Sequence, residues 1–195
     1  KVRRALDSAV DRLYDGENSL VKLFDPPFDG DGARPGYITS YGPGFRENGG
    51  QYTHGALLLV IALLRTGQAD RAWRLLRAML PSGRDTLTYK GEPFVLSADV
   101  YSAAGHAGEA GWTWYTGSAG WLLRTVTQEL LGLRLRGGLL FIEPCLPSDW
   151  GGCEVSFRGL RIGIGRDGVT VDGQSYNGGG LAVPGLAQEL GGGNN

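Results

Sequence analysis

Histidine and cysteine are scarce in this chain of 195 residues, and neither sign of charge is in excess. Its two histidines exclude a metal site built from several imidazoles, and Cys145 and Cys153 have no histidine near them to complete a zinc site. The two thiols could pair in an oxidising compartment, but we expect both to be reduced and structural. A formal net charge of −1 gives no electrostatic footprint for nucleic acid or an anionic membrane.

Long hydrophobic runs and the common catalytic motifs are also missing. The longest apolar run, from Ala56 to Leu64, is far short of the roughly 18–20 residues that span a bilayer. No charged-then-apolar leader marks the chain for export, although it starts at Lys1 rather than at a methionine. A G-x-S-x-G elbow, a P-loop, an H-E-x-x-H motif and a dinucleotide fingerprint are all absent from the sequence.

Glycine is abundant, with 34 residues, and much of it lies between the hydrophobic segments. Loops so rich in glycine either are disordered or let the backbone approach another group closely. Hydrophobic residues make up 42% of the chain, which is enough for the core of one ordinary domain.

Hydrophobic periodicity predicts a helical first part and a β-rich second part. Helices are expected over residues 1–14, 52–66, 70–80, 93–102 and 117–131, joined by long loops such as 22–48. Strands are expected over 139–142, 154–157, 160–165 and 169–171, and the stretch from 177 onward is expected to fray. We therefore predict an α+β chain with an α/α-toroid segment at 1–132, a small β-region at 133–190 and a disordered tail at 191–195.

The segment Arg46–His54 gathers unlike polar groups at the entrance to an apolar helix. Arg46, Glu47, Asn48 and His54 supply a guanidinium, a carboxylate, an amide and an imidazole within nine residues. The bland alternative is a hydrogen-bonded core histidine behind a surface ion pair of little energetic value. The density of polar groups makes a binding site an equally good interpretation.

The segment Trp112–Trp121 combines aromatic residues with the start of a helix. Thr116 suits an N-cap, and Gly117 would begin the helix. Free N–H groups and the positive end of the dipole would then be open to an anion. The alternative is a simple cap with tryptophans packed in the core, although aromatic rings are also what the apolar face of a sugar stacks on.

A third segment, Tyr89–Phe94, is followed by Asp99 and Tyr101. Glu92 precedes Pro93 at an expected helix N-terminus, where an acid is favourable in any case. Asp99 could be doing no more than accepting hydrogen bonds from loop amides. The second histidine, His106, lies between glycines and is a weak catalytic candidate.

Four stretches together resemble glycoside hydrolase family 94. They are RENGGQYTH at 46–54, YKGEPFVLSADVYS at 89–102, GWTWYTGSAGW at 111–121 and IEPCLPSDWGG at 142–152. The resemblance covers about residues 1–165 in the right order, and it is nearest to the branch found in the C-terminal domain of cyclic β-1,2-glucan synthases. The family consists of inverting glycoside phosphorylases, so phosphorolysis of a β-glucan to α-glucose 1-phosphate is the expected activity.

The resemblance implies a fold and a role for particular residues. It implies the C-terminal part of an (α/α)6 barrel followed by an antiparallel β-sheet region. His54, Thr116 and Gly117 match the family's phosphate-binding positions, while Arg46 and Glu47 match the acceptor-sugar site. Inorganic phosphate would be a co-substrate, and no cofactor or metal is implied. The family's catalytic acid, an aspartate in a Gly-Asp-Trp-Asn-Asp type motif, has no counterpart in this sequence, so the chain alone is expected to be inactive.

The expected partners are an oligo- or polysaccharide substrate, the remainder of the same catalytic domain and, as an option, a second copy in a homodimer. Nucleic acid is not expected. The expected location is the cytoplasm, including the soluble domain of a membrane-anchored synthase. Two alternatives stay open: a cellobiose-type disaccharide phosphorylase, and a non-catalytic carbohydrate-binding module in which the Trp-rich loop grips glucan.

Overall fold

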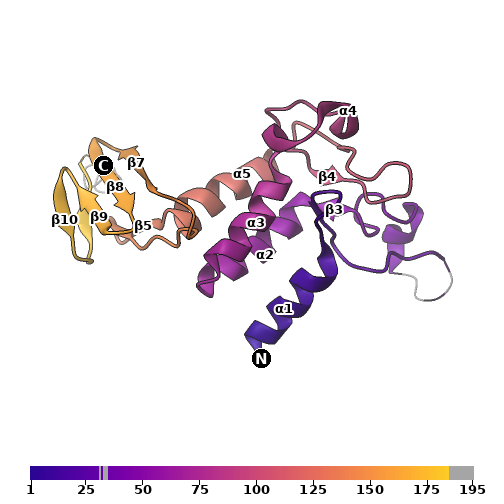
Figure 1. Cartoon of the computed structure of the whole chain (residues 1–195), viewed down its shortest axis with the longest axis horizontal. Coiled ribbons are helices and arrows are strands. Elements are labelled where there is room, and N and C mark those ends of the chain that lie inside the picture. Colours follow the sequence, from indigo (N-terminus) through magenta and orange to yellow (C-terminus); the bar gives the residue numbers. More distant parts are fainter. Residues whose placement is uncertain (31, 33–34, 185–195) are drawn as a thin grey trace, which may run out of the picture. The chain divides into compact units, whose positions relative to one another are not determined.

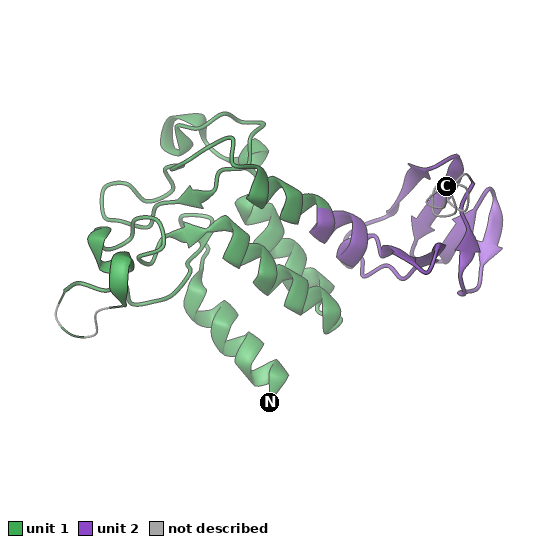
Figure 2. Ribbon diagram, turned by 180° about the vertical axis from the view of Figure 1, so that it is seen from behind, with its two compact units in different colours: residues 1–123 green, residues 124–195 purple. Residues whose placement is uncertain are grey.

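The computed structural model describes residues 1–30, 32 and 35–184, and it divides into two compact units. Unit 1 covers Lys1–Leu123 and unit 2 begins at Arg124 (Figure 2). The division therefore falls inside the last helix, several residues before the first strand of the β-region. The expected tail at 191–195 lies outside the described residues.

Unit 1 contains helices separated by long loops (Figure 1). Its helices are α1 (Val2–Leu13), α2 (Thr53–Arg65), α3 (Ala69–Met79), α4 (Thr86–Tyr89) and α5 (Thr116–Arg124), with short 3-10 turns η1 (Gly36–Ser40) and η2 (Pro81–Gly83). Two antiparallel pairs of short strands join them: β1 (Tyr14–Asp15) with β2 (Leu20–Val21), and β3 (Gln51–Tyr52) with β4 (Asp99–Val100). The helices predicted at 1–14, 52–66 and 70–80 are confirmed.

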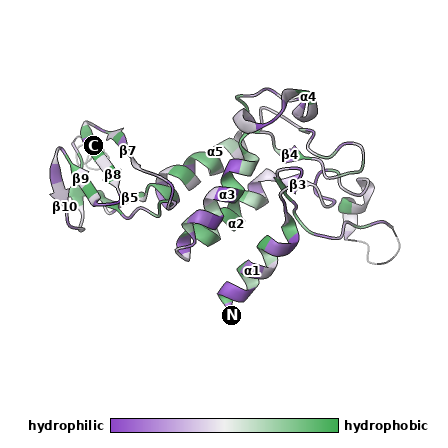
Figure 3. Cartoon of the chain, viewed as in Figure 1, coloured by the Kyte–Doolittle hydropathy of each residue, from purple (hydrophilic) through white to green (hydrophobic). Residues whose placement is uncertain are grey.

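Helices α2 and α3 pack against each other to form the centre of unit 1. The fully buried side chains on these helices include Leu57, Val60, Leu63, Leu75 and Leu76. Helix α1 alternates hydrophobic and hydrophilic residues (Figure 3) and buries only Leu6 and Val10. Within the described residues, no helix combines the length and the hydropathy that crossing a bilayer requires.

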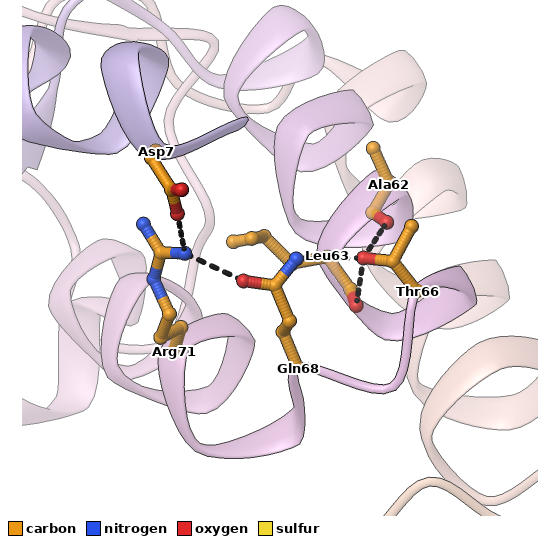
Figure 4. Close-up of polar contacts among 6 residues, drawn as sticks. All are labelled: Asp7, Ala62, Leu63, Thr66, Gln68 and Arg71. Carbon is orange, nitrogen blue, oxygen red and sulfur yellow. Dashed lines mark hydrogen bonds and ion pairs between the residues drawn. The ribbon is translucent and has the colours of Figure 1, made fainter. Parts of the chain in front are cut away.

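Polar contacts fix the turn between α2 and α3 and connect it to α1 (Figure 4). The Thr66 hydroxyl donates to the carbonyl oxygens of Ala62 and Leu63 at 2.9 and 3.0 Å, which satisfies groups at the end of α2. The Arg71 guanidinium donates to Asp7 Oδ1 and Gln68 Oε1, both at 2.5 Å. A single cation on α3 thus holds both α1 and the preceding turn.

The helix predicted at 93–102 is wrong. The chain makes turns there and then forms β4, whose residues Asp99 and Val100 pair with Tyr52 and Gln51 of β3. The backbone groups of Ala98 also bond outside the segment, with its N–H donating to Trp112 O at 2.7 Å and its carbonyl accepting from Thr53 N at 2.9 Å. These long-range partners replace the local bonds of a helix, so apolar spacing alone was misleading.

Unit 2 begins with the end of α5 and a π-helical turn, η3 (Thr125–Leu130), so the helix predicted at 117–131 changes its hydrogen bonding midway. Up to residue 184, seven strands follow: β5 (Leu133–Arg136), β6 (Leu139–Ile142), β7 (Gly152–Phe157), β8 (Leu160–Gly165), β9 (Gly168–Val171), β10 (Gln174–Tyr176) and β11 (Leu181–Ala182). They form two antiparallel sheets, of order β10-β9-β8-β7 and β11-β6-β5. The α+β class is confirmed, as are the four predicted strands.

The two sheets share one hydrophobic core. Its buried members are Leu133, Leu140, Ile142, Ile162, Ile164 and Val183. The expectation that the chain frays from 177 is wrong for the described part, because Leu181 pairs with Leu140 and Val183 is buried. Cys145 and Cys153 are both half-buried, and no disulfide joins them in the described part of the chain.

Candidate functional site

The loop that carries Arg46 and Glu47 is held by the buried side chain of Asn48. Its Nδ2 donates to the carbonyls of Phe28 and Tyr41 at 2.9 and 2.7 Å, and its Oδ1 accepts from Phe28 N at 2.8 Å. Gly49 has φ 87° and packs so tightly that a Cβ would lie 2.7 Å from Pro27 Cβ. The Asn-Gly pair is therefore structural, and it fixes the residues just before it.

Arg46 lies between two aromatic rings. Its Cζ is 4.4 Å from the Trp112 ring centroid and 5.3 Å from that of Tyr41, distances at which a guanidinium is attracted to a ring face. Its Nε lies 3.7 Å from Glu47 Oε2, too far for a hydrogen bond. Both of these buried atoms lack a hydrogen-bond partner within the described part of the chain. This ion pair therefore leaves one N–H donor and one carboxylate oxygen without a hydrogen bond.

Asp99 brings a third charge into this cluster. Its side chain is 1% exposed, and Oδ1 accepts a 2.9 Å hydrogen bond from the backbone N–H of Trp112. Oδ2 is buried and has no hydrogen-bond partner among residues 1–30, 32 and 35–184, and it lies against Gly111, where a Cβ would be only 2.2 Å away. Burial raises the pKa of Asp99, while the positive charge of Arg46 opposes the shift.

Two phenols complete the polar cluster. Burial raises the pKa of Tyr52, and the nearby charge of Glu47 adds to the shift. Burial also raises the pKa of Tyr101, helped by the charge of Asp99. Both hydroxyls therefore stay protonated near neutral pH, so they can donate hydrogen bonds to a polyhydroxyl ligand.

His54 lies on the first turn of α2 and contacts both neighbouring elements. Its ring stacks parallel to Tyr52, with centroids 6.3 Å apart and planes 8° apart. On another side its centroid is 5.2 Å from the ring of Trp121, which belongs to α5. The half-buried imidazole therefore lies beside the helix that begins at Thr116.

The amino end of α5 is exposed at Thr116 and Gly117. The helix includes Thr116, so this residue occupies the first helical position rather than the expected N-cap position, a difference of one residue. Trp121 is five residues further on, about 7.5 Å along the axis of α5. Backbone N–H groups at the start of this helix can donate to an anion, as can a protonated imidazole beside it.

Some of the sequence-predicted candidates belong to this region and others do not. The structure brings Arg46 and Glu47 together and places His54 beside α5. The alternative in which the tryptophans of the segment 112–121 pack in the core is wrong for Trp112 and Trp114, which are 53% and 68% exposed. Glu92 does not begin a helix, because a turn follows it directly. The second histidine, His106, has its Nδ1 3.3 Å from Glu109 Oε2.

Sequence reasoning underestimated Asp99 and missed the contributions of Tyr41 and Tyr52. The sequence suggests Asp99 as a buried carboxylate, with acceptance of hydrogen bonds from loop amides as the alternative, and one such bond is present. Its buried second oxygen depends on the close approach of Gly111, which no local pattern reveals. The signal available was the alternation of Asp99 and Tyr101 with apolar neighbours, which is typical of a strand.

Comparison with known proteins identifies the class. Residues 1–132 match the model of the glycosyl hydrolase 94 superfamily, catalytic domain. Since this match covers more than half of the chain, the protein belongs to that family.

The chain is similar along most of its length to individual members of the family. The chain is 46% identical over 173 residues to the cyclic beta-(1,2)-glucan synthase NdvB of Rhizobium meliloti (strain 1021), covering 84% of this chain and 6% of that protein. It is 31% identical over 185 residues to a solabiose phosphorylase of Paenibacillus borealis, covering 87% of this chain and 24% of the relative. A 3-O-beta-D-glucopyranosyl-beta-D-glucuronide phosphorylase of Paenibacillus borealis is 29% identical over 171 residues, covering 80% and 22%. The chain thus spans less than a quarter of the length of these relatives.

Proposed function

We propose that this chain is the phosphate-binding part of an inverting glycoside phosphorylase that acts on β-1,2-linked glucan. The helices of unit 1 would be the C-terminal part of an (α/α)6 barrel, and the remainder of the same domain would be the partner that completes it. The observation that supports the proposal is the contact of the His54 imidazole with Trp121, a residue about 7.5 Å along α5 from the exposed start of that helix. Both groups suit a phosphate dianion.

The reaction would divide its groups between two neighbouring sites. Phosphate held by His54, Thr116 and Gly117 would attack the anomeric carbon, while Arg46 and Glu47 would bind the acceptor sugar. A carboxylic acid would protonate the glycosidic oxygen as its bond to the anomeric carbon breaks, and inversion would give α-glucose 1-phosphate. We place that acid outside these 195 residues, because the sequence has no counterpart of the family's acid motif. A cytoplasmic location belongs to the same proposal.

Calorimetric titration with inorganic phosphate tests the proposed phosphate site. His54→Ala should weaken binding by about 1.5–3 kcal/mol, which is at least about tenfold in the dissociation constant, because a charge-assisted hydrogen bond is lost. His106→Ala is the matched control, since it removes the second histidine of the chain from an exposed position. Equal losses in the two variants, or no loss in His54→Ala, would contradict the assignment.

Turnover tests the assignment of the acid. The chain incubated with β-1,2-glucan and phosphate should release no α-glucose 1-phosphate. Release at the rate of a complete phosphorylase would show that the acid lies within the chain.

A disaccharide phosphorylase is the second candidate, favoured by the 31% identity to the solabiose enzyme. The two candidates differ in the sugars that Arg46 and Glu47 would accept. Binding of β-1,2-linked oligosaccharides in preference to cellobiose supports the first candidate, and the reverse preference supports the second.

A further inference from the structure

Four aromatic side chains of unit 1 are exposed close to one another in the sequence. Phe94, Trp112, Trp114 and Tyr115 are between 50% and 76% exposed. They form two edge-to-face pairs: Phe94 with Trp114, with centroids 6.5 Å apart, and Trp112 with Tyr115, with centroids 5.8 Å apart. An edge-to-face contact covers one face of one ring, so ring surface remains available to a ligand. We call these four residues the aromatic platform.

The ring of Trp114 is fixed in place although it is exposed. Its indole Nε1 donates a 2.8 Å hydrogen bond to Glu92 Oε1. The pKa of Glu92 is lowered, first by a bond from its own backbone N–H and then by this indole, so the acceptor is charged at neutral pH. The backbone of Trp114 is also in the left-handed region, at φ 59°, which is uncommon for a bulky residue. A surface tryptophan held in this way loses little conformational entropy when a ligand covers it.

The platform is continuous with the site proposed for the acceptor sugar. Trp112 belongs to the platform and is also the ring that stacks on the Arg46 guanidinium at 4.4 Å. Arg46 Nε and Glu47 Oε2, within the same ion pair, have unmet hydrogen-bonding capacity. A ligand that needs hydrogen bonds at one end and apolar ring contacts along the rest of its length fits both features.

We propose that the aromatic platform binds the successive glucose units of a glucan chain that extends beyond the unit held by Arg46 and Glu47. A pyranose ring presents C–H groups on its faces and hydroxyls at its rim. The faces can stack on the exposed rings, and the rim hydroxyls can bond to the Glu92 carboxylate. The identity of the sugar rests on the proposed function, whereas the platform rests on the exposure and fixation of these rings.

The experiment is calorimetric titration of the chain, without phosphate, with β-1,2-linked oligosaccharides of two and of five glucose units. The wild type should bind the longer ligand more tightly. Trp114→Ala should weaken binding of the longer ligand about tenfold, which lies within the range of a stacking contact, and leave binding of the disaccharide unchanged. Glu92→Ala should give a smaller loss of the same kind, because it releases the indole, and Glu92→Gln should restore most of it.

Leu87→Ala is the control for loss of exposed apolar surface, since Leu87 is 83% exposed on α4. It should bind both ligands like the wild type. The platform is refuted if the wild type shows no preference for longer ligands, or if Trp114→Ala binds the longer ligand normally or loses both ligands equally. A preference for length that is as strong with β-1,4-linked oligosaccharides would contradict the linkage in the proposed function and leave the platform standing.

Discussion

Replacing Gly111 with alanine should break the hydrogen bond between Asp99 and the backbone of Trp112. The new Cβ would lie 2.2 Å from Asp99 Oδ2, whereas carbon–oxygen contacts begin at about 3.3 Å, so the carboxylate must move by about 1 Å. Such a movement breaks the 2.9 Å bond from Trp112 N–H to Oδ1. A hydrogen bond to a charged group is worth about 1.5–3 kcal/mol, so the midpoint of thermal unfolding of unit 1 should fall by roughly 5–10 °C.

The assay is thermal unfolding followed by near-ultraviolet circular dichroism, which reports the packing of the tryptophans. Gly120→Ala is the matched control, because a Cβ on this α5 residue meets nothing within 4 Å and should stabilise the helix by about 0.5–1 kcal/mol. In an Asp99→Ala background, Gly111→Ala should cost much less, because the two changes act on one contact. A Gly111→Ala protein as stable as Gly120→Ala would refute this account of Asp99.

Three further predictions concern stability. Burial raises the pKa of Asp99 above the ordinary 3.8. The contribution of Asp99 to the free energy of unfolding is therefore present below pH 3.8 and is lost as the pH rises through the pKa of the folded state. Denaturant titrations at several pH values should show this loss in the wild type and not in Asp99→Asn. Gly132→Ala should lower the free energy of unfolding by several kcal/mol in the same titrations, because φ is 73° and the new Cβ would lie 2.1 Å from the backbone of Glu143. Gly137→Ala is the control: φ is 57° but the space is open, so it should cost only about 1–2 kcal/mol. Asn48→Ala should cost at least about 2 kcal/mol, because three buried hydrogen bonds disappear, and a wild-type melting curve would contradict that role.

The elements that sequence predicted well are those whose pattern and contacts agree. Strand β8, at Leu160–Gly165, alternates side chains and ends in tight turns, and its predicted bounds are confirmed. The helix prediction for 93–102 failed because the apolar spacing of this segment fits a helix, whereas its backbone pairs with residues 52, 53 and 112. Periodicity describes one chain segment, and it contains no information about a partner that is distant in sequence.

In the candidate site too, some residues can be found from the sequence and others only from the structure. Arg46, Glu47 and His54 could be found because they stand together in one polar stretch of the sequence. The position of Asp99 depends on the absence of a side chain at Gly111. The ring contact of Arg46 with Trp112 joins two segments that are more than sixty residues apart in the sequence. Both features are products of tertiary packing.

The phosphate site that we propose between His54 and the start of α5 is tested most directly by a crystal structure of this chain grown with inorganic phosphate. The account predicts one phosphate within hydrogen-bonding distance of both the His54 imidazole and a backbone N–H at Thr116 or Gly117. A phosphate bound at one of these groups alone, or at neither, would contradict it.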